Sequence, residues 1–273
     1  MRYRSYLVLL SLICLSSWGC ESKNEATKSP LPVSAGGSQS SSDADGVLEN
    51  DTDSAVSSKQ SADTESGSSS TADLSGRITL NGQIPSPRKL SITKDVDTCG
   101  AIDTIADITG SEGGVANVVI EIKDVEGDNW TYNDPADGYV MRQKDCQFRP
   151  NLLVIPNGKD IKVYNDDPVG HNVNTGDWNK MQPAGPDPIV RPVEGKSPTK
   201  IGCNIHSWME AWIYPVQNPF YAVSDEKGNF SITGIPPGKY RINIWHASLG
   251  RKNARMTLVA GKAATLDHEF DFK

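Results

Sequence analysis

Short segments of alternating apolar and polar residues, separated by Gly, Pro, Asn or Asp, run from Leu74 to the end of the chain and constrain its fold most strongly. The alternation has the two-residue period of a strand with one buried face, and no segment has the apolar stripe of a long helix. The expected strands include 76–82, 116–123, 151–158, 160–165, 229–234, 239–247 and 263–272. The pattern predicts an all-β fold of the sandwich type.

The last part of the chain carries a distinctive pair of turns. The stretch DEKGNF at 225–230, followed by GIPPGKY at 234–240, resembles the carboxypeptidase regulatory-like (transthyretin-like) β-sandwich module. The resemblance covers 219–273 and extends to the strand at 76–82. It implies a small seven-stranded sandwich that carries no chemistry by itself.

The N-terminus reads as an export signal over residues 1–19, with two arginines, an apolar run and small residues before Cys20. Gly19-Cys20 resembles a bacterial lipoprotein cleavage box, which implies a lipid on Cys20, although plain cleavage after Gly19 stays open. Cys14 is a poorer candidate because a bulky isoleucine precedes it. We therefore expect a protein at the periplasmic or cell-surface side of a bacterial membrane, anchored through its lipid.

Residues 20–74 are rich in Ser, Asp, Thr, Glu and Gly and poor in aromatic residues, which predicts a disordered tether. A globular region at 75–218 and the module at 219–273 follow. The net charge of −7 argues against nucleic acid as a partner.

Three cysteines remain beyond Cys20, namely Cys99, Cys146 and Cys203. Cysteines tend to pair in the oxidising compartments that exported proteins reach, and three leave one over. The economical pairing is Cys99 with Cys146, because the neighbours of Cys203 offer its thiolate another use. In the alternative, Cys203 forms the disulfide and no metal site exists.

Cys203, His206 and Met209 follow one another at three-residue intervals, between a strand at 199–202 and another at 211–214. Type 1 copper needs a thiolate, two imidazoles and a weak axial ligand. A loop between two strands can supply three of these four ligands. His171, which follows the strand at 160–165, is available as the second imidazole.

The Cys-x-x-His-x-x-Met loop and the HNV segment at 171–173 together resemble the cupredoxins, with the short loop spacing of amicyanin-type members. The resemblance implies a Greek-key β-sandwich that binds one mononuclear type 1 copper ion. His171, Cys203 and His206 would be the equatorial ligands and Met209 the axial one. Asn172 would support the site by a hydrogen bond to the ligand loop.

The same resemblance implies that the loop histidine, His206, is partly exposed and serves as the electron port. Trp208 and Trp212 could shield the sulfur from water. Ile205 and Ser207 stand where the family has prolines, and this departure bears on the potential of the copper ion.

Other candidate residues have simpler interpretations. Met181 is a rival thioether, but Met209 has the better spacing. His246 and His268 lie in strands of the last module and are expected to be structural. The acidic pairs 166–167 and 225–226 lie in turns, where carboxylates serve the backbone. No nucleophile elbow, phosphate loop or paired-carboxylate site is present, so we do not expect an enzyme.

The resulting hypothesis is an exported copper protein that exchanges single electrons with an unidentified redox partner protein. Two alternatives stay open. One is a copper-binding or copper-delivery protein without a redox partner, and the other is a metal-free adhesion or carbohydrate-binding sandwich in which Cys203 is disulfide-bonded.

Overall fold

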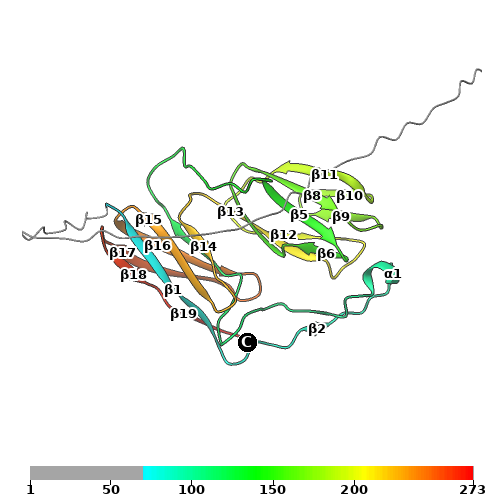
Figure 1. Ribbon diagram of the computed structural model, residues 1–273, viewed down its shortest axis with the longest axis horizontal. Coiled ribbons are helices and arrows are strands. Elements are labelled where there is room, and N and C mark those ends of the chain that lie inside the picture. The colour runs from blue at the N-terminus through cyan, green and yellow to red at the C-terminus, as the bar shows by residue number, and fades with distance from the viewer. Residues whose placement is uncertain (1–69, 273) are drawn as a thin grey trace, which may run out of the picture. The chain divides into compact units, whose positions relative to one another are not determined.

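The computed structural model describes residues 70–272, which form 19 strands and one short helix (Figure 1). The predicted all-β fold is confirmed. The expected signal at 1–19, the anchor at Cys20 and nearly all of the expected tether lie outside the described residues. In the part of the chain that is described, no helix has the length and apolarity needed to cross a membrane.

A five-stranded sheet and a four-stranded sheet form what we call the central sandwich. It is built from β5 to β13. The first sheet has the order β10-β9-β12-β13-β7, and the second has the order β11-β8-β5-β6. The strands of the first sheet are Asn179–Gln182, His171–Asn174, Thr199–Gly202, Glu210–Val216 and Leu152–Pro156. Those of the second are Gly185–Pro192, Asp160–Asn165, Tyr139–Lys144 and Gln147–Arg149. Alternate residues, such as Ile161 and Val163 on β8, point into a shared apolar core.

The remaining sheets form what we call the terminal sandwich, which consists of β1, β4 and β14 to β19. One sheet has β1 (Ala72–Asn81) beside β15 (Asn229–Ile235), β18 (Ala263–Thr265) and β19 (His268–Asp271). The other has the order β14-β4-β16-β17, over Tyr221–Val223, Val119–Lys123, Gly238–His246 and Gly250–Leu258. Their core contains Ile78, Ile120 and Phe270 among its buried residues.

Strand pairing joins two early strands, β1 and β4, to the strands that follow residue 218. β1 pairs antiparallel with β15 and parallel with β18 and β19, and β4 pairs with β14 and β16. β1 contains the 76–82 strand that the last module is expected to include, and β4 lies within the range expected for the cupredoxin-like region. β1 also begins at Ala72, before the expected end of the tether, because Ala72 and Leu74 alternate onto its buried face.

Residues 83–106 form what we call the strap. It runs from β1 to the central sandwich and then back toward the terminal sandwich (Figure 1). It contains β2 (Arg88–Lys89), α1 (Val96–Cys99) and β3 (Thr104–Ile105), and β2 pairs with β3. Cys99 is buried in the core of the central sandwich. At its far end the chain rejoins the terminal sandwich, where Ser248 Oγ donates to the carbonyl of Asp107.

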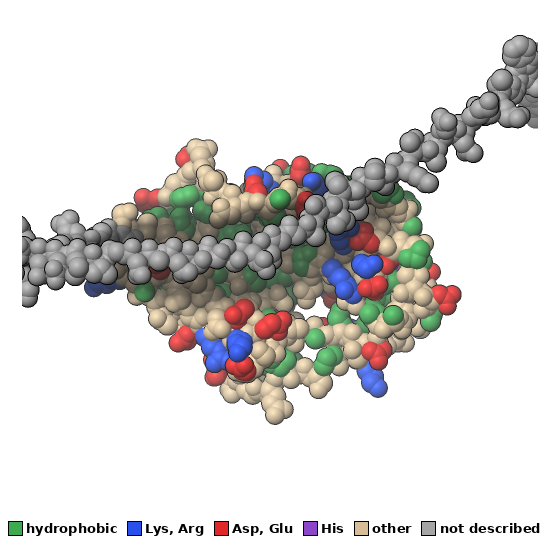
Figure 2. Space-filling view, in the orientation of Figure 1, with side chains coloured by type: hydrophobic (Ala, Val, Ile, Leu, Met, Phe, Trp, Pro, Cys, Tyr) green, Lys and Arg blue, Asp and Glu red, His purple; other side chains and the backbone are tan. Residues whose placement is uncertain are grey.

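The two sandwiches share a small cluster of buried side chains. Tyr214 and Val216 on β13 pack with Val119 on β4 and Trp245 on β16. On the molecular face drawn in Figure 2, acidic and basic side chains are interspersed.

Candidate metal centre

The loop between β12 and β13 is a compact turn held by two backbone hydrogen bonds. The amide of Met209 donates to the carbonyl of His206 at 2.9 Å, and the amide of Cys203 donates to the carbonyl of Met209 at 3.2 Å. These bonds hold the loop in one conformation, and β12 and β13 hold its two ends. The side chains of Cys203, His206 and Met209 therefore have fixed positions. The loop therefore presents a thiol, an imidazole and a thioether from one short stretch.

His171 is the first residue of β9, whose neighbour in the sheet is β12. This pairing brings the His171 ring to the loop. Its Nδ1 lies 2.9 Å from His206 Nδ1, and Cys203 Sγ lies 3.9 Å from the same His206 atom. The ligand atoms of the three residues all lie within 4.8 Å of one another. Both histidines are 0% exposed and Cys203 is 5% exposed.

These distances fit a single metal ion. Two nitrogens bound at about 2.0–2.1 Å lie at most about 4 Å apart, and a nitrogen and a thiolate sulfur bound at about 2.3 Å lie at most about 4.4 Å apart. The observed 2.9 Å and 3.9 Å satisfy both limits. Imidazole with a thiolate is a donor set that suits copper or zinc.

The outer nitrogens of both histidines meet carboxylates. His171 Nε2 lies 2.8 Å from Asp167 Oδ2, and His206 Nε2 lies 2.7 Å from Asp95 Oδ2. An ionised carboxylate only accepts hydrogen bonds, so a neutral imidazole that donates to it through Nε2 presents a lone pair at Nδ1. Two lone pairs that face each other in a buried site repel, and a shared cation removes this repulsion.

Burial lowers the pKa of His171 below its ordinary value, although the hydrogen bond to Asp167 acts in the opposite direction. Metal ions bind neutral imidazole. The environment of His171 therefore favours the form that a metal ion requires.

Met209 is almost fully buried, at 1% exposure, in the same core as Cys203. The side-chain Oδ1 of Asn172 accepts a hydrogen bond from the backbone amide of Asn204 at 2.6 Å. The backbone amide of Asn172 donates to Cys203 Sγ at 3.5 Å. Its Nδ2 also donates to Asn179 Oδ1. Asn172 thus links β9 to the ligand loop and to the sulfur.

The predicted disulfide between Cys99 and Cys146 is present, and Cys203 is a free, buried cysteine. The alternative in which Cys203 forms the disulfide is therefore wrong. The two bonded sulfurs also lie close to His206, within the same 4.8 Å limit that joins the ligand cluster.

His206 differs from its expected role as an exposed electron port, because it is completely buried. Asp95 of the strap covers its Nε2, and the Trp208 ring lies 5.2 Å from its ring, between centroids. Trp208 is buried and donates through Nε1 to the carbonyl of Cys146, so it does enclose the loop. Trp212 does not shield the sulfur, because it lies on the opposite face of β13 against Trp245.

The rival candidates differ from Met209 and from the clustered histidines in their surroundings. Met181 is 60% exposed on β10. His246 Nδ1 accepts hydrogen bonds from the amides of Ser248 and Leu249, which is a structural role at the end of β16. His268 stacks edge-on against Phe270 in the terminal sandwich.

Asp95 and Asp167 are the residues that sequence reasoning missed. The sequence predicts that Asp167 serves a turn, but its carboxylate contacts His171, which follows it by four residues. This short spacing could have indicated the contact from the sequence. Asp95 lies 111 positions before His206, and no local pattern connects them. Asp225, in contrast, does serve its turn, since its Oδ1 accepts from the amides of Lys227 and Asn229.

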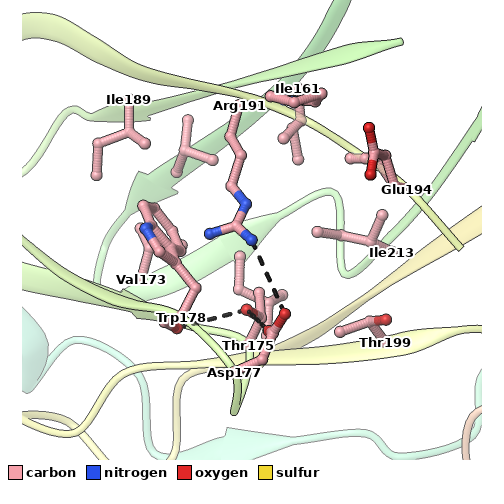
Figure 3. Close-up of a pocket in the computed structure, with 14 residues that line it drawn as sticks. Ile161, Val173, Thr175, Asp177, Trp178, Ile189, Arg191, Glu194, Thr199 and Ile213 are labelled. Carbon is pink, nitrogen blue, oxygen red and sulfur yellow. Dashed lines mark hydrogen bonds and ion pairs between the residues drawn. The ribbon is translucent and has the colours of Figure 1, made fainter. Parts of the chain in front are cut away.

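The central sandwich has a surface groove and an internal cavity. A groove runs beside Cys203 and Met209 and is otherwise polar, with Asn174 and Glu210 among its lining residues. A separate cavity of about 80 Å³ opens between the two sheets of the central sandwich. Figure 3 shows Arg191 at this cavity, above the Trp178 ring and 3.8 Å from Asp177. No histidine or cysteine lines this second cavity.

Comparison with family models and with curated proteins finds no match for this chain. Similar solved structures include a purple cupredoxin from Nitrosopumilus maritimus, at 20% identity over 28% of this chain and 98% of that one, with a TM-score of 0.25. Amicyanin from Paracoccus versutus is 16% identical over 35% of this chain and 96% of its own, with a TM-score of 0.26. A copper-containing nitrite reductase from Thermus scotoductus is 16% identical over 34% of this chain and 25% of its own, with a TM-score of 0.27.

Proposed function

We propose that this protein binds one mononuclear type 1 copper ion through His171, Cys203, His206 and Met209 and acts as a single-electron carrier. The observation that carries the proposal is the buried cluster of two inward Nδ1 atoms and one free thiol, at 2.9 Å and 3.9 Å. A thiolate with two imidazoles is the equatorial set of blue-copper sites. Met209, from the same loop, is the proposed axial ligand.

Copper, when bound, supplies a one-electron couple between Cu(II) and Cu(I), and the chain holds the ligands in place. The cluster is fixed by two paired strands, by the closed loop and by the carboxylates on both Nε2 atoms. The amide of Asn172 donates toward the sulfur and withdraws electron density from it. Because all three clustered ligands are at most 5% exposed, electron exchange is favoured over coordination of a substrate.

The proposal extends to location and partner. The Cys99–Cys146 disulfide is typical of oxidising compartments outside the cytoplasm. Together with the signal-like sequence before Cys20, it supports an exported protein anchored by lipid, which exchanges electrons with a redox partner protein rather than turning over a substrate.

Copper delivery is a second candidate, because the groove beside Cys203 and Met209 gives an ion a route to the ligands. A delivery protein would use the same ligands but release the ion to an acceptor. Electrochemistry separates the two functions, since delivery needs no reversible couple.

The test is to load the full chain with Cu(II) and record its visible spectrum and voltammogram. We expect an intense thiolate-to-copper band that is lost in Cys203→Ser, and a reversible one-electron wave. The exposed Met181→Leu variant is the matched control and keeps both. Absence of the band in the wild-type protein contradicts the copper assignment, and a band without a reversible wave favours delivery.

A further inference from the structure

The strap contributes Asp95 to the metal centre, although it belongs to neither sheet of the central sandwich. Asp95 immediately precedes α1 and has left-handed backbone angles, φ 49° and ψ 44°. An aspartate that immediately precedes a helix commonly caps it with its carboxylate. Here the side chain makes no capping bond and instead reaches His206 Nε2 at 2.7 Å.

The side chain of Asp95 is therefore committed to the histidine and not to its own helix. It remains 34% exposed, whereas the imidazole it contacts is fully buried. Asp95 thus forms the outer boundary of the cluster at His206. The other histidine has a corresponding partner in Asp167, which belongs to the central sandwich itself.

A continuous series of contacts connects these two carboxylates. Asp167 accepts hydrogen bonds from the amides of Asp145 and Cys146, at 2.7 Å and 2.8 Å, in the turn between β5 and β6. Cys146 is bonded to Cys99, which ends α1 four residues after Asp95. The turn and the disulfide therefore set the position of Asp95 relative to Asp167.

We propose that Asp95, held over the site by the Cys99–Cys146 disulfide, is a positioning residue that keeps the proton of His206 on Nε2 and leaves Nδ1 free for the metal ion. This inference rests on the proposed function. Without the carboxylate, the proton moves to Nδ1, where it donates to His171 Nδ1 and relieves the repulsion between the two lone pairs. A metal ion must then displace that proton before it binds.

The test compares Asp95→Asn and Asp95→Ala with Asp97→Asn in the full chain. Asp97 lies within α1 and is exposed, so its substitution removes the same charge two residues away from Asp95. In the metal-free protein, long-range ¹H–¹⁵N spectra report which ring nitrogen carries the proton. We expect the His206 proton on Nε2 in the wild type and Asp97→Asn, and on Nδ1 in Asp95→Ala.

Competition with a Cu(I) chelator provides the second measurement. Loss of a carboxylate behind a ligating histidine lowers metal affinity by about 10–100-fold. We expect this loss in both Asp95 variants and no change in Asp97→Asn. The double variant Cys99→Ala/Cys146→Ala should resemble Asp95→Ala at His206, while His171 keeps its proton on Nε2 through Asp167.

The inference is overturned if His206 keeps the same protonated nitrogen in Asp95→Ala as in Asp97→Asn. If the alanine variant does not fold, the isosteric Asp95→Asn decides through the Cu(I) affinity, and an unchanged value overturns the inference. Failure of the proposed function looks different. In that case the wild type lacks the Cys203-dependent copper band, while the ring-proton spectra still show whether Asp95 controls His206.

Discussion

The four histidines of the chain differ in what lies beside their ring nitrogens. His171 and His206 each place Nε2 on a carboxylate and Nδ1 toward the other ring. His246 instead accepts two backbone amides through Nδ1 and is buried at 4% exposure. Only the first two thus have the outer partner that a metal-binding imidazole usually has.

His246 makes the stability of the protein depend on pH. Burial lowers its pKa to about 4 in the folded protein, below the usual value near 6.5. The neutral form is therefore the stabilising one, and its contribution is complete above pH 6.5 and is lost as the pH falls toward 4. A difference of this size corresponds to about 3 kcal/mol.

We expect the free energy of unfolding, measured by denaturant titration, to fall between pH 6.5 and 4 partly through this group. His246→Asn keeps an acceptor near the amides of Ser248 and Leu249 but cannot take up the proton. Its pH profile should be flatter than that of the wild type over this window. Parallel profiles for the two proteins would show that His246 does not titrate in this way.

The loop of the candidate site could be singled out from the sequence because Cys203, His206 and Met209 are local to one another. His171 could be added because it follows a recognisable strand. Asp95 could not, since its contact with His206 depends on the strap and the disulfide. The burial of His206 was missed for the same reason, because the residues that cover it are remote in the chain.

At the scale of single elements, β13 is the strand with two different faces. Met209, just before it, and Ala211 and Ile213 on it pack into the core of the central sandwich. Trp212 and Tyr214, on the other face, pack against the terminal sandwich. A single strand therefore connects the loop of the candidate metal centre to the contact between the two sandwiches.

Tyr214 supports a carboxylate that is buried between these sandwiches. Its hydroxyl donates to Glu121 Oε2 at 2.9 Å and accepts from Asn243 Nδ2 at 2.5 Å. Glu121 is 0% exposed and also pairs with Lys123 at 2.9 Å. Burial raises the pKa of Tyr214, so the hydroxyl stays protonated and able to donate.

Removal of this hydroxyl leaves a buried carboxylate oxygen with one donor fewer. We expect Tyr214→Phe to lower the free energy of unfolding by about 1–3 kcal/mol. Tyr164→Phe, at a partly buried site on β8, is the matched control and should change stability by less than about 0.5 kcal/mol. A combined Tyr214→Phe/Glu121→Gln variant should recover part of the loss, and strict additivity of the two substitutions would argue against the pairing.

At the scale of the whole molecule, the positions of most strands could be predicted, but the grouping of β4 with the strands of the terminal sandwich could not. Alternation shows that a strand has a buried face without showing which sheet covers it. β4 is an example, because Val119 to Ile122 are all buried. One face of β4 lies in the core of the terminal sandwich and the other contacts β13, so it lacks a simple alternating pattern.

The grouping predicts the behaviour of a fragment that spans only 75–218. In this fragment β1 lacks β15, β18 and β19, and β4 lacks β14 and β16. We expect hydrogen exchange to show unprotected amides in β1 and β4, while β8 and β13 stay protected. The chain from 70 to 272 is the control and should protect all four strands. Protection of β1 in the fragment would mean that its pairing with the tail is dispensable.

β4 and β14 pair directly, although the whole central sandwich lies between them in the chain. During synthesis β1 and β4 leave the ribosome first and then await partners that are translated last. The central sandwich can meanwhile complete its sheets, because all nine of its strands have already emerged. Apolar residues such as Ile78 and Ile120 stay uncovered throughout this interval, so the newly made chain is most vulnerable to aggregation just before its final strands appear.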